Sequence, residues 1–496
     1  MKKTITLLSL ALGLTVSAQA SAAAANTNTA STIASYGTDS LVKTDGTFWI
    51  WGPQQPVPTQ VPELSGVTSM LGNKMVEKQD HTVWLWETKV LSKAVTVKPV
   101  SGISNVAKIE GYGPMLAIDA DGNVFSSVKT DEGWDLTHFE PVKGIDHVTD
   151  VESFYRSNDK TGEGRRVFLK SDGTVWTNSD SAQTFTPVKN LDNVVQLEDT
   201  IALKKDGTVW TWPKTLKGTG PLPGTLSATK IQSLSHIKSI WQNQKSSLAI
   251  DNQSRLWFWG ATVTGYSDGP VYTDHAKPVL LTGVKNVKEA YIVENSIVAF
   301  TGDGKVYETS IQRNQVPSNV SFKLLASDVV SVKNGDRHII MQKKDGTLWG
   351  WGVNKAAELG HGDYEFMHNT PVPVQKPISV SLNGENVPLG SGVITRNEQN
   401  FVPLRSVFEK MGAEVSYDEK SKTAKVTRNE AGKPAISIAV NVKTGSITLN
   451  NNPIRFDNKP FTVDGTVYLP LRLISEKLGA TVNWLPNEER IAIRMD

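Results

Sequence analysis

The stretch Asp345-Gly-Thr-Leu-Trp-Gly-Trp-Gly352 decides the fold of this 496-residue chain, because versions of it recur along most of the sequence. Its Asp-Gly pair is typical of a tight turn between antiparallel strands, and the alternation after it places Trp349 and Trp351 on one face of a strand. One hairpin cannot bury two indole rings alone. Copies of the turn begin 34 to 51 residues apart, at Asp45, Asp80, Asp121, Asp172, Asp206, Gln253, Asp303 and Asp345. A period of this length predicts stacked supersecondary units.

The last of these units shows the order of its strands most clearly. A first apolar strand is expected over Val329–Lys333 and a second over His338–Gln342, followed by the turn, an aromatic strand and a return that ends near Val374. Three or four short strands in each unit, with no helical period, are typical of a propeller blade. We therefore predict an all-β propeller of seven or eight blades over residues 26–376.

The octapeptide and the segment Asp45–Gly52 resemble the repeats of propellers related to the regulator of chromosome condensation, whose bacterial members carry a turn followed by Val-Trp-x-Trp-Gly. The likeness spans roughly Ser31–Gln375. Seven blades are usual in that family, whereas eight hairpins are counted here, so both blade numbers stay open. The resemblance implies a scaffold whose face binds another protein.

Eleven of the fourteen tryptophans occupy the two aromatic positions of the repeat. They could form a ring of platforms on which sugars stack, or they could form the core between blades. Each buried indole removes about 150–250 Å² from water, roughly 4–6 kcal/mol gross as an upper value, which is reason enough for a core position. The regular recurrence favours the core.

Residues 377–496 follow a different pattern, with two related halves 67 residues apart that begin at Phe401 and Tyr468. Each half has an apolar strand, a proline, apolar residues at helical spacing and a Gly-Ala pair that ends the helix. Hairpin turns are expected at Asn383-Gly384 and Asn450-Asn451. The sequence predicts a small α+β domain with an internal duplication.

These halves, with their Val-Pro-Leu-Arg and Gly-Ala signatures, resemble the stalk-type domain named after the amino terminus of copper amine oxidases. The resemblance implies an extracellular accessory or attachment module without oxidase chemistry. The last histidine of the chain is His368, so the domain has no imidazole for copper and we expect no cofactor. Its helices carry Arg405 with Glu409 and Arg472 with Glu476, which could mark a ligand-binding face or form surface ion pairs; the ion pairs are favoured.

The amino-terminal residues 1–25 have the composition of a secretory signal peptide. Lys2 and Lys3 precede an apolar run over Ile5–Val16 and small residues near Ala20. The formal net charge of +2 falls to zero without these lysines, which gives no reason to expect nucleic acid as a partner. The chain has no cysteine and no later run long enough to span a membrane. We expect a secreted or wall-associated monomer, typical of a Gram-positive bacterium.

Three functions are compatible with these features. The first is a secreted, non-catalytic scaffold that binds an extracellular protein, with the stalk domain as its attachment module. The second is an envelope protein that binds cell-wall polymer or polysaccharide. The third, a propeller hydrolase or lyase, has the least support, because the sequence contains no nucleophile elbow, phosphate loop or zinc-helix spacing.

The candidate partner site follows from differences in length between units. The Asp-Gly turns are uniform, whereas Ser153–Arg166 reads as a long loop between the first and second strands of the fourth unit. Inserted loops on one face of a repeat array commonly carry binding residues, although a tolerated, solvated insertion would look the same. The residues predicted to contact a partner are Tyr155, Arg156, Lys160, Arg165 and Arg166.

Overall fold

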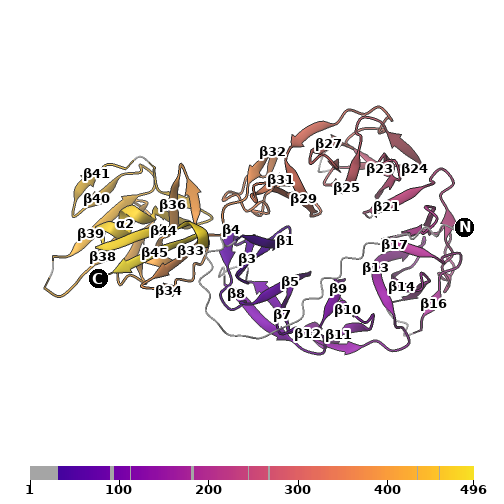
Figure 1. Cartoon of the computed structure of the whole chain (residues 1–496), viewed down its shortest axis with the longest axis horizontal. Coiled ribbons are helices and arrows are strands. Elements are labelled where there is room, and N and C mark those ends of the chain that lie inside the picture. Colours follow the sequence, from indigo (N-terminus) through magenta and orange to yellow (C-terminus); the bar gives the residue numbers. More distant parts are fainter. Residues whose placement is uncertain are drawn as a thin grey trace, which may run out of the picture.

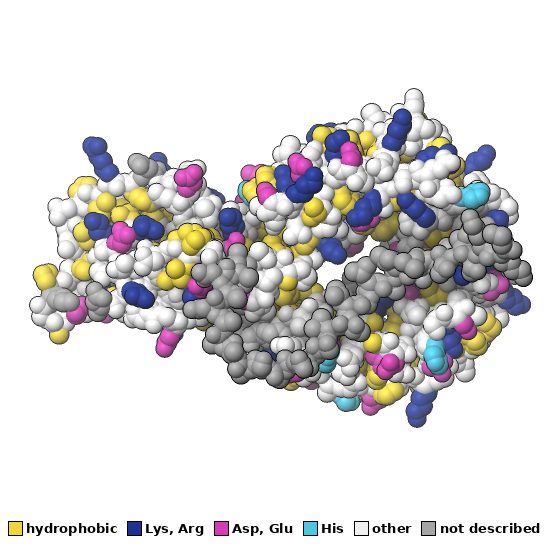
Figure 2. All heavy atoms as spheres, viewed as in Figure 1, with side chains coloured by type: hydrophobic (Ala, Val, Ile, Leu, Met, Phe, Trp, Pro, Cys, Tyr) yellow, Lys and Arg dark blue, Asp and Glu magenta, His cyan; other side chains and the backbone are white. Residues whose placement is uncertain are grey.

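The computed structural model describes residues 32–89, 94–111, 113–179, 184–243, 245–265, 269–432, 434–456 and 458–495. Eight antiparallel sheets of four strands follow one another along the chain and form a ring (Figure 1). The blade number is therefore eight. Figure 2 shows an opening at the centre of the ring. The predicted signal peptide over residues 1–25 lies outside the described residues.

The first four blades contain β1 (Ile33–Tyr36), β2 (Ser40–Lys43), β3 (Phe48–Gly52), β4 (Gln55–Gln60), β5 (Val67–Gly72), β6 (Met75–Lys78), β7 (Val83–Thr88), β8 (Val95–Val100), β9 (Val106–Glu110), β10 (Leu116–Asp119), β11 (Val124–Thr130), β12 (Gly133–Pro141), β13 (Val148–Ser157), β14 (Gly162–Lys170), β15 (Val175–Ser179) and β16 (Thr186–Pro187). The other four contain β17 (Val194–Glu198), β18 (Ile201–Lys204), β19 (Val209–Thr211), β20 (Thr229–Lys230), β21 (Ile237–Gln242), β22 (Ser246–Asp251), β23 (Leu256–Thr264), β24 (Val271–Leu281), β25 (Val287–Val293), β26 (Ser296–Thr301), β27 (Val306–Ser310), β28 (Lys323–Ala326), β29 (Val329–Asn334), β30 (His338–Lys343), β31 (Leu348–Val353) and β32 (Met367–Pro373).

In five of the eight blades, the turn after the second strand is held by a short relay of hydrogen bonds. In the eighth blade Asp345 Oδ1 accepts from the backbone N–H and the hydroxyl of Thr347 (3.0 and 2.6 Å), and Trp349 Nε1 donates to that hydroxyl oxygen (3.0 Å). Accepting these bonds lowers the pKa of Asp345. The same relay recurs in the turns that begin at Asp45, Asp80, Asp172 and Asp206. It explains why threonine and tryptophan follow Asp-Gly at this spacing.

The glycine of the turn also joins neighbouring blades. Gly207 has a φ of +78°, and a Cβ there would lie 2.9 Å from Cα of His236, which precedes the first strand of the next blade. Its carbonyl oxygen accepts from Ile237 N (3.0 Å). Equivalent bonds link Gly46 to Val67 and Gly304 to Val329. The turns therefore cannot vary in length without separating two blades.

The second tryptophan of the motif belongs to the core, as predicted. Eight hydrophobic clusters fill the eight junctions between neighbouring blades. Trp51, Trp86, Trp212 and Trp351 are buried in four of these clusters. The first tryptophan is buried in the first blade and half-buried in the others.

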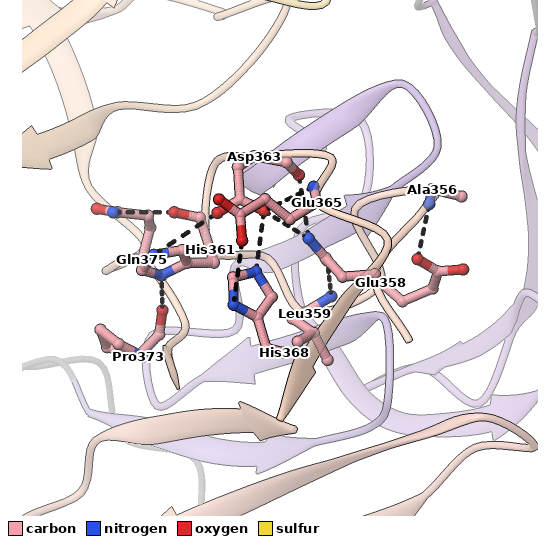
Figure 3. A network of polar contacts seen from close by, with 10 residues as sticks. Ala356, Glu358, Leu359, His361, Asp363, Glu365, His368, Pro373 and Gln375 are labelled. Carbon is pink, nitrogen blue, oxygen red and sulfur yellow. Dashed lines mark hydrogen bonds and ion pairs between the residues drawn. The ribbon is translucent and has the colours of Figure 1, made fainter. Parts of the chain in front are cut away.

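The ring closes where the eighth blade meets the first. The segment 354–366, between β31 and β32, crosses to the first blade, where Trp51 Nε1 donates to the Glu358 carbonyl oxygen (2.9 Å). Figure 3 shows how polar contacts fix this segment. Asp363 accepts from Asn354 Nδ2 (2.6 Å) and His368 Nε2 (3.1 Å), and His361 Nδ1 donates to the Pro373 carbonyl oxygen (2.7 Å). Within the described residues no strand is exchanged between the two blades. Closure therefore depends on this segment, on the cluster between the blades and on direct hydrogen bonds such as that between the Tyr36 and Ser331 hydroxyl groups (2.8 Å).

The C-terminal domain contains β33 (Ser379–Leu382), β34 (Glu385–Asn386), β35 (Ile394–Arg396), β36 (Gln399–Pro403), α1 (Leu404–Phe408), β37 (Glu414–Asp418), β38 (Thr423–Arg428), β39 (Ile436–Asn441), β40 (Ile447–Leu449), β41 (Asn452–Ile454), β42 (Phe461–Val463), β43 (Thr466–Pro470), α2 (Leu471–Lys477), β44 (Ala480–Leu485), the 3-10 helix Pro486–Glu488 and β45 (Arg490–Met495). The two predicted halves pair directly, since β36 lies antiparallel to β43 with Val402 opposite Leu469. Both helices and parts of all three sheets surround one core.

Pro403 and Pro470 each end a strand and cap the helix that follows. One detail of this domain differs from the prediction. The two Arg–Glu pairs on the helices form no ion pair among the described residues. Both predicted hairpin turns are present. No described helix is long and apolar enough to cross a membrane.

The C-terminal domain packs against the first and eighth blades (Figure 1). Val57 of β4 shares a buried cluster with Ile394 and Tyr468. Thr59 Oγ1 accepts from the backbone N–H of Gly392 (2.8 Å), and a Cβ on that glycine would lie 2.0 Å from the Pro58 carbonyl oxygen. The backbones of the two domains are therefore in close contact at this point.

Candidate functional site

The two faces of the propeller differ in the variability of their connections. The second and third strands are always joined by the four-residue turns described above, as at 44–47 and 344–347. On the opposite face, the connection between the third and fourth strands ranges from 53–54 in the first blade to 212–228 in the fifth. We call this opposite face the variable face. The prediction placed the variation in the loops between first and second strands, but these are short in all eight blades.

The predicted long loop Ser153–Arg166 is wrong, because most of it is strand. β13 and β14 pair without interruption from Asp150 to Ser157, with Tyr155 opposite Gly164. Only residues 158–161 form the turn. Successive side chains of this hairpin point to opposite faces of the sheet, as in any β-strand. Phe154 and Arg156 are therefore buried, whereas Tyr155 between them is 65% exposed.

The structure separates the five predicted contact residues into two groups. Arg156, Arg165 and Arg166 are buried. Arg156 Nη1 donates to the Pro223 carbonyl oxygen (2.9 Å), and Arg165 Nη1 donates to that of Gly224 (3.1 Å). Arg166 Nη2 donates to the Pro114 carbonyl oxygen of the third blade (2.9 Å). These guanidinium groups hold neighbouring backbone segments.

Tyr155 and Lys160 form the second group, and both are exposed on the variable face. The turn between them is fixed to the fifth blade. Asn158 Nδ2 donates to the Gly220 carbonyl oxygen (2.6 Å), and Asp159 Oδ2 accepts from Gly218 N (2.8 Å). The exposed tyrosine therefore stands on a hairpin that is braced by the long 212–228 connection.

Further exposed aromatic side chains lie on the same face. Trp134 on β12 is 37% exposed and Tyr272 on β24 is 48% exposed, and both follow the connection between third and fourth strands. Phe366, at the end of such a connection in the eighth blade, is 61% exposed. Sequence reasoning missed these residues, although Trp134 is one of the three tryptophans outside the motif. Acidic and basic side chains are interspersed over the molecular surface in view (Figure 2).

The first strand of each blade lies nearest the centre of the ring (Figure 1). Several of these strands bring carboxyl groups near one another. Glu152 lies 3.1 Å from Lys108 of the preceding blade. Burial raises the pKa of Glu152 to about 7 against the opposing charge of Lys108. Burial, reinforced by the charge of Glu152, raises the pKa of Glu198 to about 8. Burial also raises the pKa of Glu110. We call Lys108, Glu110, Asp150, Glu152 and Glu198 the inner ring.

A repeated pattern could have revealed the inner ring from the sequence. Lys108-Ile-Glu110, Asp150-Val-Glu152 and Gln196-Leu-Glu198 occupy the same positions of successive first strands, with a buried apolar residue between two polar ones. Within the described part of the chain, no three histidine, aspartate or glutamate side chains are grouped so that they could hold a metal ion.

These features define an eight-bladed propeller with one uniform and one variable face, joined to a duplicated α+β domain. Residues 381–493 match the family model of the copper amine oxidase N-terminal domain, which confirms that resemblance. In sequence the chain is similar to human E3 ubiquitin-protein ligase HERC2, with 28% identity over 239 residues. It is also similar to Protein pim1 of Schizosaccharomyces pombe, with 26% identity over 162 residues.

The matched regions are partial. They cover 41% of this chain and 5% of HERC2, and 26% of this chain and 30% of pim1. Among solved structures, that of Kap60 bound to yeast RCC1 (Prp20) aligns with 14% identity and a TM-score of 0.40, over 74% of this chain and 91% of that chain. The sequence similarity to HERC2 and pim1 agrees with the predicted resemblance of the repeats to propellers related to the regulator of chromosome condensation.

Proposed function

We propose that this protein is a secreted, non-catalytic scaffold whose variable face binds an extracellular protein, with the C-terminal domain as an accessory or attachment module. The observation that supports the proposal most directly is the set of exposed aromatic side chains on that face. Tyr155, Trp134 and Tyr272 project from strands of three blades, and Phe366 adds a fourth ring. Exposed aromatic groups on a rigid support are the usual anchors of protein interfaces.

The location outside the cell is part of the proposal. It is supported by the signal-peptide composition of residues 1–25 and by the match of the C-terminal domain to a family whose members we expect in secreted proteins. The lack of cysteine fits a Gram-positive source.

Site-specific photocrosslinking tests the binding face. A benzoylphenylalanine residue replaces Tyr155, Trp134 or Tyr272 in the full chain, which is then illuminated with the secreted proteins of its source organism. We expect one protein to be crosslinked from all three positions. The controls are Val195 and Val330, which are 55% and 44% exposed at the start of first strands, on the side of the Asp-Gly turns. Equal crosslinking from the controls would refute the proposed face.

A catalytic function would depend on the inner ring, where Glu152 and Glu198 have raised pKa values of the kind that general acids need. The scaffold proposal expects Glu152→Gln and Glu198→Gln to leave capture of the crosslinked partner unchanged. Conversion of that partner by the parent chain, lost in both variants, would favour the catalytic alternative.

A further inference from the structure

A cleft of about 1110 Å³ lies between the propeller and the C-terminal domain. Its propeller wall comes from β1, β2 and the Asp-Gly turn and aromatic strand of the eighth blade. The other wall comes from β36, the start of α2 and β44, and the connecting residues 373–378 complete the lining. This cleft is separate from the variable face, since its propeller residues cluster at the opposite, Asp-Gly end of the eighth blade.

Each wall of the cleft contributes an indole ring. Trp349 is held in place, because its Nε1 donates to Thr347 and the Lys343 ammonium lies 3.8 Å from the ring centroid. Trp484, on β44, is 38% exposed. A half-buried ring and an exposed ring on facing domains give the cleft two aromatic surfaces that need little ordering when a ligand binds.

The polar lining of the cleft includes several uncharged amides beside its charged groups. Five side chains of this kind contribute, namely Gln342, Gln375, Gln399, Asn400 and Asn483. Oε1 of Gln399 is buried without a hydrogen-bond partner among the described residues. An amide offers both donors and an acceptor, so it can donate to a hydroxyl oxygen or accept from a hydroxyl O–H.

The charged groups of the cleft disfavour an anionic ligand. Arg472 and Lys376 are the basic side chains in the lining, against the carboxylates of Asp345, Glu398, Glu476 and Glu489. Arg472 and Glu476 are exposed and form no ion pair with one another within the described residues. They remain available to hydroxyl groups of a ligand.

We propose that the cleft binds a short segment of neutral glycan. Sugar rings present apolar C–H faces that pack on indole rings, and their hydroxyl groups match a lining of amides. A phosphate-rich wall polymer would instead need a cluster of basic side chains. This inference goes beyond the proposed protein-binding function, since it assigns a different ligand to a different surface.

Calorimetric titration of the full chain tests this inference, with cellohexaose, chitohexaose and maltohexaose as neutral probes and hexagalacturonate as the anionic probe. We expect at least one neutral hexasaccharide to bind and the anionic one not to bind. Trp484→Ala should weaken the binding by about tenfold, the equivalent of one good aromatic contact. Trp484→Phe should restore most of it.

The matched control is Trp134→Ala, which removes an indole that is 37% exposed and does not line the cleft. Its affinity for the glycan should equal that of the parent chain. Asn483→Ala gives a second, milder reduction that does not depend on removing a large side chain. The inference is overturned if none of the neutral hexasaccharides binds at millimolar concentration, or if hexagalacturonate binds equally well. It is also overturned if Trp484→Ala and Trp134→Ala have the same affinity for the glycan.

Discussion

Lys43 of the first blade and Glu489 of the C-terminal domain form an ion pair with a nitrogen–oxygen distance of 3.1 Å, and the lysine side chain is only 2% exposed. Lys43 Nζ also donates to the Glu488 carbonyl oxygen (3.4 Å) and lies 5.8 Å from the centroid of Trp49. The end of β2, next to the turn of the first blade, is thereby tied directly to the residues that precede β45.

Removing the lysine should therefore destabilise the contact between the domains. Lys43→Ala leaves a carboxylate that is 23% exposed, so water offsets part of the loss and we expect a cost of about 1–2 kcal/mol. Urea unfolding monitored by tryptophan fluorescence measures it. The double variant Lys43→Met, Glu489→Gln should recover part of the loss, because no unpaired charge remains. A double variant less stable than the single one would contradict this account.

We also predict that residues 377–496 fold when expressed alone, because the domain has its own core around Val407, Phe408 and Ile474. The isolated domain should melt several degrees below its transition in the full chain, since Ile394 loses its contact with Val57. Calorimetry of both proteins compares the two transitions. An unfolded or aggregated fragment would show that the domain depends on the propeller.

The turn glycines allow a matched pair of substitutions. Gly207 and Gly346 have similar φ values of +78° and +82°, but a Cβ on Gly207 would meet His236 at 2.9 Å, whereas one on Gly346 would meet nothing within 4 Å. Gly346→Ala should cost about 1 kcal/mol for the left-handed backbone alone. Gly207→Ala should cost at least about 1 kcal/mol more, because backbone atoms must move. Equal effects in urea unfolding would show that the turns do not fix the blade spacing.

The contrast between the turns and the variable face explains what could be predicted from the sequence. Asp345, Thr347 and Trp349 form their relay within five residues, so the sequence alone indicates the hairpin and its repeats. The partner of Arg156 is the Pro223 carbonyl oxygen, 67 residues away. Any residue offers a carbonyl oxygen, so nothing in the sequence marked this arginine as a structural brace. The cleft likewise depends on how two domains meet, which neither set of repeats determines.

The inner ring should make stability depend on pH. Glu198 has a pKa of about 8 in the folded chain and Glu152 one of about 7, both above the ordinary value of 4.5. Between pH 4.5 and 8 the folded state therefore binds more protons at these sites than the unfolded state, and their contribution to stability falls as the pH rises. Glu198→Gln should raise the unfolding free energy at pH 9 by about 1–2 kcal/mol and change it little at pH 4.

Thermal unfolding of the parent and variant at pH 4 and pH 9 measures this difference. The control is Glu132→Gln, at the exposed end of the β11–β12 hairpin. It should leave the stability unchanged at both pH values. A Glu198→Gln variant whose stability follows that of the parent at both pH values would show that this carboxyl group ionises normally in the folded chain.

The β13–β14 hairpin should separate binding from stability, because its exposed and buried residues alternate. Tyr155→Ala removes a side chain that is 65% exposed, so it should change the unfolding free energy by less than about 0.5 kcal/mol while weakening capture of the protein partner. Arg156→Ala should have the opposite profile, with a loss of about 2–3 kcal/mol, since a buried side chain is removed and the Pro223 carbonyl oxygen loses the nearer of its two charged donors. In a double variant, Arg165→Ala should add less to the loss of stability than it costs as a single substitution, because both guanidinium groups donate to the Pro223 carbonyl oxygen.

Replacing residues 155–166 with a short turn would remove the binding residue and the stabilising arginines together. Only the single substitutions can therefore distinguish partner binding from stability. A Tyr155→Ala chain that is fully stable and still captures the partner with parental affinity would remove this tyrosine from the binding face.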